Sequence, residues 1–324
     1  MVTVKEMLKD VYLTTPELKM VEKKLGETLS SRSLHMSNLS GHMLKGGKRL
    51  RPLLVILSAS FYEHSTLPLV GTAAAVELIH TASLIHDDII DRAAQRRGKA
   101  TINHTWGNRS AVLVGDFLFA KAFELMSRNK NLKILELMTQ SIGLMCEGEI
   151  EQAQKSWDCR KTEEAYLEQV YKKTSFLISA CCRAGGILSH MPQEELEHIA
   201  DFGLQLGYAY QITDDMLDYS SSNITGKPVE NDLAQGTLNH PLLFLIRHPL
   251  YKDKVKGIIE SRELSPENME FIRRAIYQCG ALEYSYQKAK QRIIWARENL
   301  QYLPASYPKK VLLNMADQVI ARQK

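Results

Sequence analysis

Apolar side chains recur every three or four residues along most of the chain, whereas the strict alternation typical of strands is scarce. The pattern predicts helices over residues 16–31, 34–45, 51–63, 68–91, 107–128, 131–156, 162–190, 192–219, 240–247, 266–278, 280–302 and 307–322. Many of these segments carry a proline at or near the first turn, where the missing backbone N–H costs nothing. No Ser- or Gly-rich linker divides them, so we expect one all-α domain over residues 1–324, with irregular segments at 92–105 and 220–239.

Two of the predicted helices, 68–91 and 192–219, end in the same acidic pattern. The repeated carboxylates are Asp87, Asp88 and Asp91 in the first helix and Asp214, Asp215 and Asp218 in the second. This DDxxD spacing puts the first and last acid of each set on one helix face, with about 5–6 Å between their Cβ atoms. Acids at a helix C-terminus are repelled by the helix dipole, so they need a cation that neutralises them. Hard oxygen ligands in pairs suit Mg²⁺, which keeps several waters and is completed by substrate phosphates.

Basic segments that suit phosphate binding stand before and after each acidic pattern in the sequence. Gly46-Gly47-Lys48-Arg49-Leu50-Arg51 opens one predicted helix, and Arg96-Arg97-Gly98 follows the first acidic helix. Lys172-Lys173-Thr174 and Gly226-Lys227 add further cations in the second half of the chain. Glycines let the backbone approach an anion closely, and adjacent guanidiniums can each make a bidentate contact with a different phosphate. The sequence therefore predicts a site that holds a diphosphate through Mg²⁺, and the two irregular segments are placed to close over it.

These motifs make the chain similar to the trans-isoprenyl diphosphate synthase family, of the long-chain polyprenyl diphosphate synthase type, from about Gly46 to Pro241. The resemblance implies an isoprenoid synthase bundle of long helices around a central cavity. It implies an enzyme that condenses an allylic diphosphate with isopentenyl diphosphate and releases a long all-trans polyprenyl diphosphate. It also implies three Mg²⁺ ions per active site and a homodimer, which we expect to form through long apolar helices of the first half.

The resemblance assigns roles to single residues. Isopentenyl diphosphate is bound by Gly47, Lys48, Arg51, His80 and Arg97, and the allylic diphosphate by Arg96, Lys173 and Lys227. Mg²⁺ is held by Asp87, Asp91 and Asp214, with Asp88, Asp215 and Asp218 as direct or water-mediated partners. Thr174 and Gln211 turn their dipoles toward the developing carbocation.

Four further positions either differ from the family pattern or are given no catalytic role. Many relatives carry a further lysine where this chain has Thr237, which leaves open how many cations surround the allylic diphosphate. Glu149 and Gln152 are expected to pack near the site or to support the substrate-binding residues, rather than to act as catalysts. Lys172 is expected to be a solvated neighbour of Lys173.

Product length is expected to depend on the helix turn below Asp87. Ser83 and Ala82 stand four and five residues before Asp87, about 5–7 Å deeper along the helix axis. The prenyl tail is expected to grow down this helix toward its N-terminus. Short-chain relatives block that level with an aromatic residue, whereas here it is open and Ile79 narrows the path only partly. The small side chains favour a long product, in the range of quinone side chains.

Composition excludes several classes of protein. The net charge of +4 is too small to indicate nucleic-acid binding, and no basic patch is interleaved with aromatic residues. The five cysteines show no metal-ligand spacing and are expected to be buried in a protein of the reducing cytoplasm. The N-terminus has no signal-peptide core, and no apolar run approaches the ~18 residues of a membrane span. We therefore expect a cytoplasmic protein, with at most peripheral membrane contact for product release.

Several other functions remain open on the sequence. A geranylgeranyl diphosphate synthase would share every motif, and a catalytic subunit that requires a partner would as well. A regulatory subunit is disfavoured because such subunits lose aspartates, and both sets are intact here. A terpene cyclase has no need for Lys48, Arg51 and Arg97. A metal phosphohydrolase with a His-Asp pair is disfavoured because neither His80 nor His104 completes a ligand pattern with His86.

Overall fold

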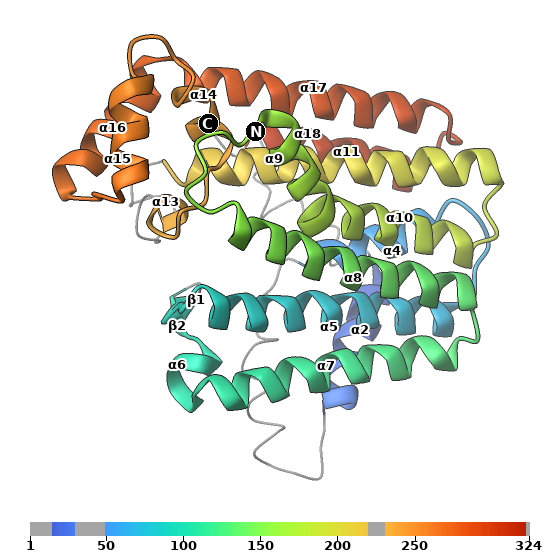
Figure 1. The fold of residues 1–324 in the computed structure, drawn as a ribbon. Coiled ribbons are helices and arrows are strands. Elements are labelled where there is room, and N and C mark those ends of the chain that lie inside the picture. Colours follow the sequence, from blue (N-terminus) through green and yellow to red (C-terminus); the bar gives the residue numbers. More distant parts are fainter. Residues whose placement is uncertain (1–14, 30–48, 97, 220–230, 322–324) are drawn as a thin grey trace. The chain divides into compact units, whose positions relative to one another are not determined.

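The computed structural model describes residues 15–29, 49–96, 98–219 and 231–321, and these residues are almost entirely helical (Figure 1). The helices of the first half are α2 (Pro16–Leu29), α4 (Leu50–Ala59), α5 (Thr66–Ile90), α6 (Ile102–Trp106), α7 (Asn108–Arg128) and α8 (Leu132–Gln154). Next come α9 (Glu163–Val170), the π-helix η1 (Tyr171–Ser175), α10 (Phe176–Leu188) and α11 (Gln193–Leu217). The last are α13 (Asn231–Ala234), α14 (His240–Leu245), α15 (Lys252–Ser261), α16 (Pro266–Gln278), α17 (Ala281–Gln301) and α18 (Tyr307–Ala321).

The chain forms two compact units. Unit 1 contains residues 1–142, 178–201 and 299–315, and unit 2 contains residues 143–177, 202–298 and 316–324. The single domain expected from the sequence stays a prediction, and each unit is described here by itself.

Unit 1 is built around α5. Helices α2, α4 and α7 all pack against it, and Figure 1 shows α5 and α7 running side by side. Residues 69–79 of α5 are buried without interruption, because all of them except Glu77 are apolar or small, and the carboxylate of Glu77 is paired with Arg49.

Within the described chain, α5 is also the one helix long and apolar enough to cross a membrane by length and composition. The expectation that no apolar run reaches that length was therefore wrong. However, 78% of the most apolar stretch of α5 is buried inside the protein, as in the core helix of a globular unit.

The segment after α5 is more regular than expected. Two short strands, β1 (Gln95–Arg96) and β2 (Lys99–Ala100), pair antiparallel, with Gln95 opposite Ala100. The turn between them contains Gly98, whose φ of 72° lies in the left-handed region that suits glycine. Figure 1 shows this hairpin at the end of α5, followed at once by α6. Residues 92–105, expected to be irregular, are thus a hairpin and the start of a helix.

Unit 2 has its own apolar core, which gathers residues of α9, α11, α14, α15, α16 and α17. The predicted helix at 162–190 is interrupted at η1, where the backbone adopts π-helical hydrogen bonding over five residues. Such π-bulges often lie at functional sites. The helix α15 was missed because its apolar positions are few and charged residues fill half of it.

Most other predicted helices are confirmed within a few residues, and 266–278 is confirmed at both ends. The helix predicted at 34–45 lies outside the described residues. The expectation of buried cysteines is confirmed for Cys159, Cys181 and Cys182. It was wrong for Cys146, which is exposed, and Cys279 is only half-buried.

Candidate active site

The first aspartate motif turns its middle acid into the protein. Asp88 is only 1% exposed, and its Oδ1 accepts a hydrogen bond of 2.6 Å from Nε of Arg96. Its Oδ2 is buried without a hydrogen-bond partner in the part of the chain that is described. Burial raises the pKa of Asp88, and the charge of Arg96 opposes that rise. Asp87 and Asp91, one helical turn apart, are half-buried. The motif thus contains one anchored acid and two that reach toward solvent.

Hydrogen bonds fold the following hairpin onto the last turn of α5. The N–H of Ala93 donates to the carbonyl of Asp88 at 2.9 Å, and the side-chain amide of Asn103 donates to the same carbonyl at 3.1 Å. The hydroxyl of Thr101 donates to the carbonyl of Ala93 at 2.7 Å. These contacts fix Arg96 beside the acids, where part of its guanidinium stays accessible to solvent.

The first turn of α4 carries a cation suited to an anion. The side chain of Arg51 is half-buried, and its Nε is buried with no hydrogen-bond partner among the described residues. The preceding Arg49 is buried and forms ion pairs with Glu22 of α2 and Glu77 of α5, the latter at 2.8 Å. Arg49 therefore ties the start of α4 to two helices, and this holds Arg51 in place. Gly47, Lys48 and Arg97 lie outside the described residues.

One face of α5 is less deeply buried than the rest of the helix. Its half-buried residues His80, Ser83, Leu84, Asp87 and Asp91 share this face, because each residue turns the helix by about 100°. Ala82 and Ile79, which were expected to set product length together with Ser83, are fully buried and lie on other sides of the helix. Of the three, Ser83 is therefore the one that shares a face with Asp87.

His86 is turned toward α7 rather than toward Asp87. Its Nε2 lies 3.3 Å from the carbonyl of Val112 and 3.7 Å from Oδ1 of Asp116. A Cβ atom at Gly115 would stand 2.1 Å from the same Nε2, so only glycine leaves room for the ring there. This packing gives His86 a structural contact and weakens the interpretation as a His-Asp phosphohydrolase.

The second aspartate motif also buries its middle acid, but with neutral partners. The carboxylate of Asp215 accepts hydrogen bonds from the hydroxyl of Tyr166 at 2.7 Å, the amide of Gln211 at 2.8 Å and the N–H of His240 at 3.1 Å. Burial raises the pKa of Asp215 to about 7, and the nearby charge of Asp232 acts in the same direction. Burial also lowers the pKa of His240 to about 4, so its ring is neutral. Of the outer acids, Asp214 is exposed and Asp218 is half-buried.

The π-helix η1 brings Thr174 and Lys173 next to this motif. The hydroxyl of Thr174 donates to Oε1 of Gln211 at 3.0 Å, so a hydrogen-bonded chain runs from Thr174 through Gln211 to Asp215. Because its proton is used in this bond, the oxygen of Thr174 keeps its lone pairs for another partner.

Lys173 is held by two residues of α8. Its Nζ lies 2.5 Å from Oε2 of Glu149 and donates to Oε1 of Gln152 at 2.8 Å. A Cβ at Gly148 would stand 2.8 Å from Cγ of Lys173, so the glycine allows this close approach. Lys227 lies outside the described residues.

The expectation for Lys172 was wrong. Its side chain is only 13% exposed, and its Nζ lies 2.6 Å from Oε1 of Glu151 and within 4 Å of Glu147 and Glu168. These carboxylates raise the pKa of Lys172. The residue belongs to a cluster of ion pairs and is not simply solvated.

Sequence reasoning missed Lys161, which is linked to Lys173 through the side chains of Gln169 and Gln152. It is buried, and its Nζ donates to Oε1 of Gln169 at 2.6 Å and to the carbonyl of Leu238 at 3.2 Å. The amide of Gln169 donates in turn to Oε1 of Gln152, the same oxygen that accepts from Lys173. Because the ammonium of Lys161 can only donate, the amide oxygen of Gln169 must face it. This fixes the orientation of the Gln169 amide and, through it, that of the Gln152 amide. Burial lowers the pKa of Lys161 to about 8.

Lys161 also bears on the departure at Thr237. Its ammonium contacts the carbonyl of Leu238, the next residue along the chain, while the amide of Gln152 donates to the hydroxyl of Thr237 at 3.4 Å. A buried cation therefore lies close to the place where many relatives carry a lysine. No sequence signal marks Lys161, because its neighbour Arg160 looks equivalent in the sequence and is 90% exposed.

The acids fit Mg²⁺ better than a metal that requires a preformed cage. Among the described residues, no three His, Cys, Asp or Glu side chains lie close enough to hold an ion by themselves. Paired carboxylates at the helix ends suit Mg²⁺, which takes one or two protein carboxylates and completes its shell with water and phosphate.

Comparison with known proteins agrees with these features. The Polyprenyl synthetase family matches residues 34–276. The octaprenyl diphosphate synthase of Escherichia coli (strain K12) is 35% identical over 316 residues, which are 96% of this chain and 98% of that protein. Heptaprenyl diphosphate synthase component 2 of Bacillus subtilis (strain 168) is 34% identical over 309 residues, 95% of this chain and 88% of that protein.

A solved structure shows the same fold. The polyprenyl synthase from Caulobacter crescentus CB15, crystallised in complex with calcium and isoprenyl diphosphate, is 32% identical. It aligns over 100% of this chain and 99% of its own length with a TM-score of 0.93, which confirms the expected all-α isoprenoid synthase fold. The chain belongs to the polyprenyl synthetase family of metal-dependent prenyltransferases.

Proposed function

We propose that this chain, a long-chain trans-polyprenyl diphosphate synthase, elongates prenyl diphosphates with its two aspartate motifs and the cations beside them. One observation carries the proposal. Each motif buries its middle acid in protein hydrogen bonds, whereas its outer acids are half-buried or exposed at a helix end. Carboxylates that are accessible to solvent at the negative end of a helix suit a cation and its phosphate ligands.

The two substrates are bound by two different sets of residues. Isopentenyl diphosphate is bound by Gly47, Lys48, Arg51, His80 and Arg97. The buried Nε of Arg51 supports this, because its N–H is available to donate to an anion. Arg96, Lys173 and Lys227 bind the allylic diphosphate. Lys161 replaces part of the charge that is absent at Thr237.

The reaction proceeds by ionisation, condensation and elimination. When bound by Asp87, Asp91 and Asp214, with three ions per active site, Mg²⁺ supplies positive charge that neutralises the diphosphate leaving group. Arg96 and Lys173 neutralise the same group from the protein side, so that the C–O bond of the allylic substrate breaks.

The allylic carbocation is then stabilised and captured. The lone pairs left on Thr174, oriented by Gln211, face the cation in a site that excludes water. The double bond of isopentenyl diphosphate attacks the cation and forms the new C–C bond. The condensed cation loses a proton to the departing diphosphate, which restores a double bond and leaves the product five carbons longer.

Product length tests this reading of α5. Purified protein with Mg²⁺, isopentenyl diphosphate and farnesyl diphosphate is expected to give long-chain products, sized by chromatography of the released prenyl alcohols. A phenylalanine at Ser83 or at Ala82 fills the level about one helical turn below Asp87 and is expected to shift the products to shorter chains. Ser83→Phe should act more strongly, because Ser83 shares the half-buried face with Asp87.

A matched variant separates length control from damage to the core. Ala122 is a buried alanine of α7, so Ala122→Phe should lower stability without changing product length. Unchanged lengths in both α5 variants would contradict the proposed path of the tail. Products of the wild type that stop at geranylgeranyl diphosphate would favour the short-chain alternative. Activity only after a second chain is added would identify the catalytic half of a heteromeric synthase.

A homodimer and a cytoplasmic location remain part of the proposal. Exposed apolar side chains near the ends of α5 and α7, among them Ile90, Val112 and Leu113, suit a helical interface between two copies. Light scattering after size exclusion would measure the mass, and a monomer that is fully active would argue against this interface.

A further inference from the structure

One end of unit 1 is formed by the turns that precede α5, join α7 to α8 and join α10 to α11. The side-chain amide of Asn129 donates to the carbonyl of Pro68 at 3.0 Å and to the hydroxyl of Thr72 at 2.9 Å. These bonds hold the α7–α8 turn against the start of α5. This end therefore lies a full helix length from Asp87 and Asp91, which terminate α5.

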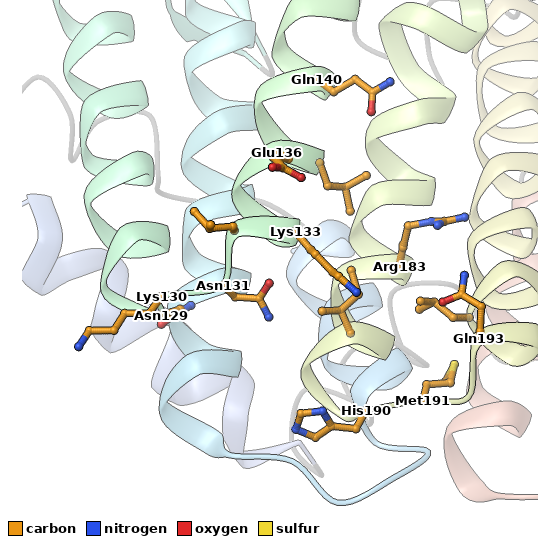
Figure 2. Close-up of a pocket in the computed structure, with 14 residues that line it drawn as sticks. Asn129, Lys130, Asn131, Lys133, Glu136, Gln140, Arg183, His190, Met191 and Gln193 are labelled. Atoms are coloured by element: carbon orange, nitrogen blue, oxygen red, sulfur yellow. The ribbon is translucent and has the colours of Figure 1, made fainter.

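An open cavity of about 970 Å³ lies at this end (Figure 2). Its walls come from the first turns of α8 and from the turn between α10 and α11. The cations that line it are Lys130, Lys133 and Arg183, His190 is a further polar lining residue, and the apolar lining includes Leu132, Leu137, Ile187, Met191 and Leu196. We call the group Leu67, Lys130, Leu132, Lys133 and His190 the turn surface.

The cations of the turn surface are available to an external anion. Arg183 forms an ion pair with Glu197, but within the described chain Lys130 and Lys133 have no ion-pair partner. Glu136 is the one acid in the cavity lining. The cavity is therefore positively charged overall.

Lys133 lies where a cation is electrostatically unfavourable. It stands in the first turn of α8, which contains no acidic residue, and the positive end of the helix dipole repels it. Figure 2 shows its ammonium reaching from α8 into the cavity. An anion bound in the cavity would be stabilised by both the ammonium and the helix end.

Large apolar side chains project from the same end. Leu67 is 80% exposed and Leu132 is 70% exposed, and the bonds of Asn129 keep their two turns together. Exposed leucines beside unpaired lysines are typical of a surface that enters the interface of an anionic membrane. A soluble anion would use the lysines but would leave the leucines in water.

We propose that the turn surface docks the enzyme on anionic phospholipid, with lipid phosphate beside Lys130 and Lys133 and with Leu67 and Leu132 in the acyl boundary. Only the purpose of the docking rests on the proposed function. In that function the prenyl tail grows down α5 from Asp87 toward Leu67, so docking at this end would deliver a water-insoluble product to lipid. Membrane binding itself needs no catalytic step.

Vesicle sedimentation of the full chain tests the docking. Vesicles of phosphatidylcholine with phosphatidylglycerol should bind the protein, vesicles of phosphatidylcholine alone should bind it far less, and salt should weaken the binding. Each neutralised lysine should weaken partitioning about fivefold, so Lys130→Gln with Lys133→Gln should weaken it about 25-fold. Leu67→Ser and Leu132→Ser should each weaken it by about tenfold or more.

Unit 2 offers matched controls for both kinds of change. Leu250 is 82% exposed and Lys252 is also exposed, so Leu250→Ser and Lys252→Gln should leave vesicle binding unchanged. All these variants should keep the wild-type rate with a water-soluble primer, which separates failed docking from failed catalysis. Equal binding to neutral vesicles, or equal loss in the unit 2 controls, would overturn the proposal. So would a change of oligomeric state in the lysine or leucine variants, since it would assign the surface to a second copy.

Discussion

The two aspartate motifs have the same spacing but solve the burial of their middle acid in different ways. Asp88 is paired with the guanidinium of Arg96, which is fixed by the hairpin that follows α5. Asp215 is surrounded by three neutral donors from Tyr166, Gln211 and the backbone of His240. Burial raises the pKa of both carboxyls, and that of Asp215 rises to about 7.

The comparison shows that each DDxxD motif contains two kinds of acid, the two outer acids and the middle acid. The outer acids are half-buried or exposed in both motifs, so they suit the same role. The middle acids are structural anchors, one held by an ion pair with Arg96 and the other held by neutral donors in a buried position that raises its pKa. An identical substitution should therefore act alike at the outer positions and differently at the middle ones.

The largest effect is expected at the outer acids. Asp87→Ala and Asp214→Ala should each lower kcat by orders of magnitude, because each removes a proposed Mg²⁺ ligand at the leaving group. Both side chains reach solvent, so the free energy of unfolding of each variant should stay within about 0.5 kcal/mol of the wild-type value. Steady-state kinetics at saturating Mg²⁺, with calorimetry of each variant, measures both quantities. Full activity in either variant would break the equivalence of the outer acids.

A smaller and unequal effect is expected at the middle acids. Asp88→Asn removes the charge that faces Arg96 and should lower the free energy of unfolding by about 1–3 kcal/mol. Asp215→Asn should cost less than about 1 kcal/mol. If the Gln211 amide flips, its oxygen can accept from the new Asn amide while its nitrogen donates to Thr174. Urea unfolding of the two variants gives the comparison directly.

The dependence on pH sharpens the same comparison. In the folded protein Asp215 holds its proton up to about pH 7, whereas the unfolded chain releases it near pH 4. The folded state thus binds more protons in this range, and the free energy of unfolding should fall as the pH rises from about 4 to about 7. With the metal chelated, Asp215→Asn should lack this part of the slope, and at pH 8 it should equal or exceed wild type. Parallel slopes in wild type and Asp215→Asn would show that Asp215 is ionised throughout.

The outer and middle acids could not have been distinguished from the sequence. Helical periodicity predicts that Asp87 and Asp91 share a face of α5. In the structure they do, because this arrangement depends only on residues within one helix. Arg96, the partner of Asp88, is 8 positions away in the chain, and Tyr166, one of the partners of Asp215, is 49 positions away. Spacing carries no information about such contacts, which are decided by how the helices pack.

The same limit applies to the cations. Lys172 and Lys173 are adjacent in sequence, yet the π-helical turn places one among three glutamates and the other beside Gln152. The hairpin at β1 and β2 was missed because two-residue strands leave too short a pattern to recognise.

The smallest effect is expected at Lys161, which has no counterpart among the described residues around the first motif. Lys161→Met removes the donor that orients Gln169 and Gln152, so the amide of Gln152 can turn its nitrogen toward Lys173 and repel it. Lys173 is proposed to bind the allylic diphosphate, so KM for that substrate should rise several-fold, up to about tenfold, while kcat changes less. Stability should hardly change, because a buried methionine avoids the cost of a desolvated ammonium. Arg160→Met, at the exposed neighbouring position, should leave KM unchanged. Equal KM values in the two variants would mean that Lys161 does not orient the amides of Gln169 and Gln152. The second motif would then not depend on a distant charge, whereas the first motif depends on Arg96.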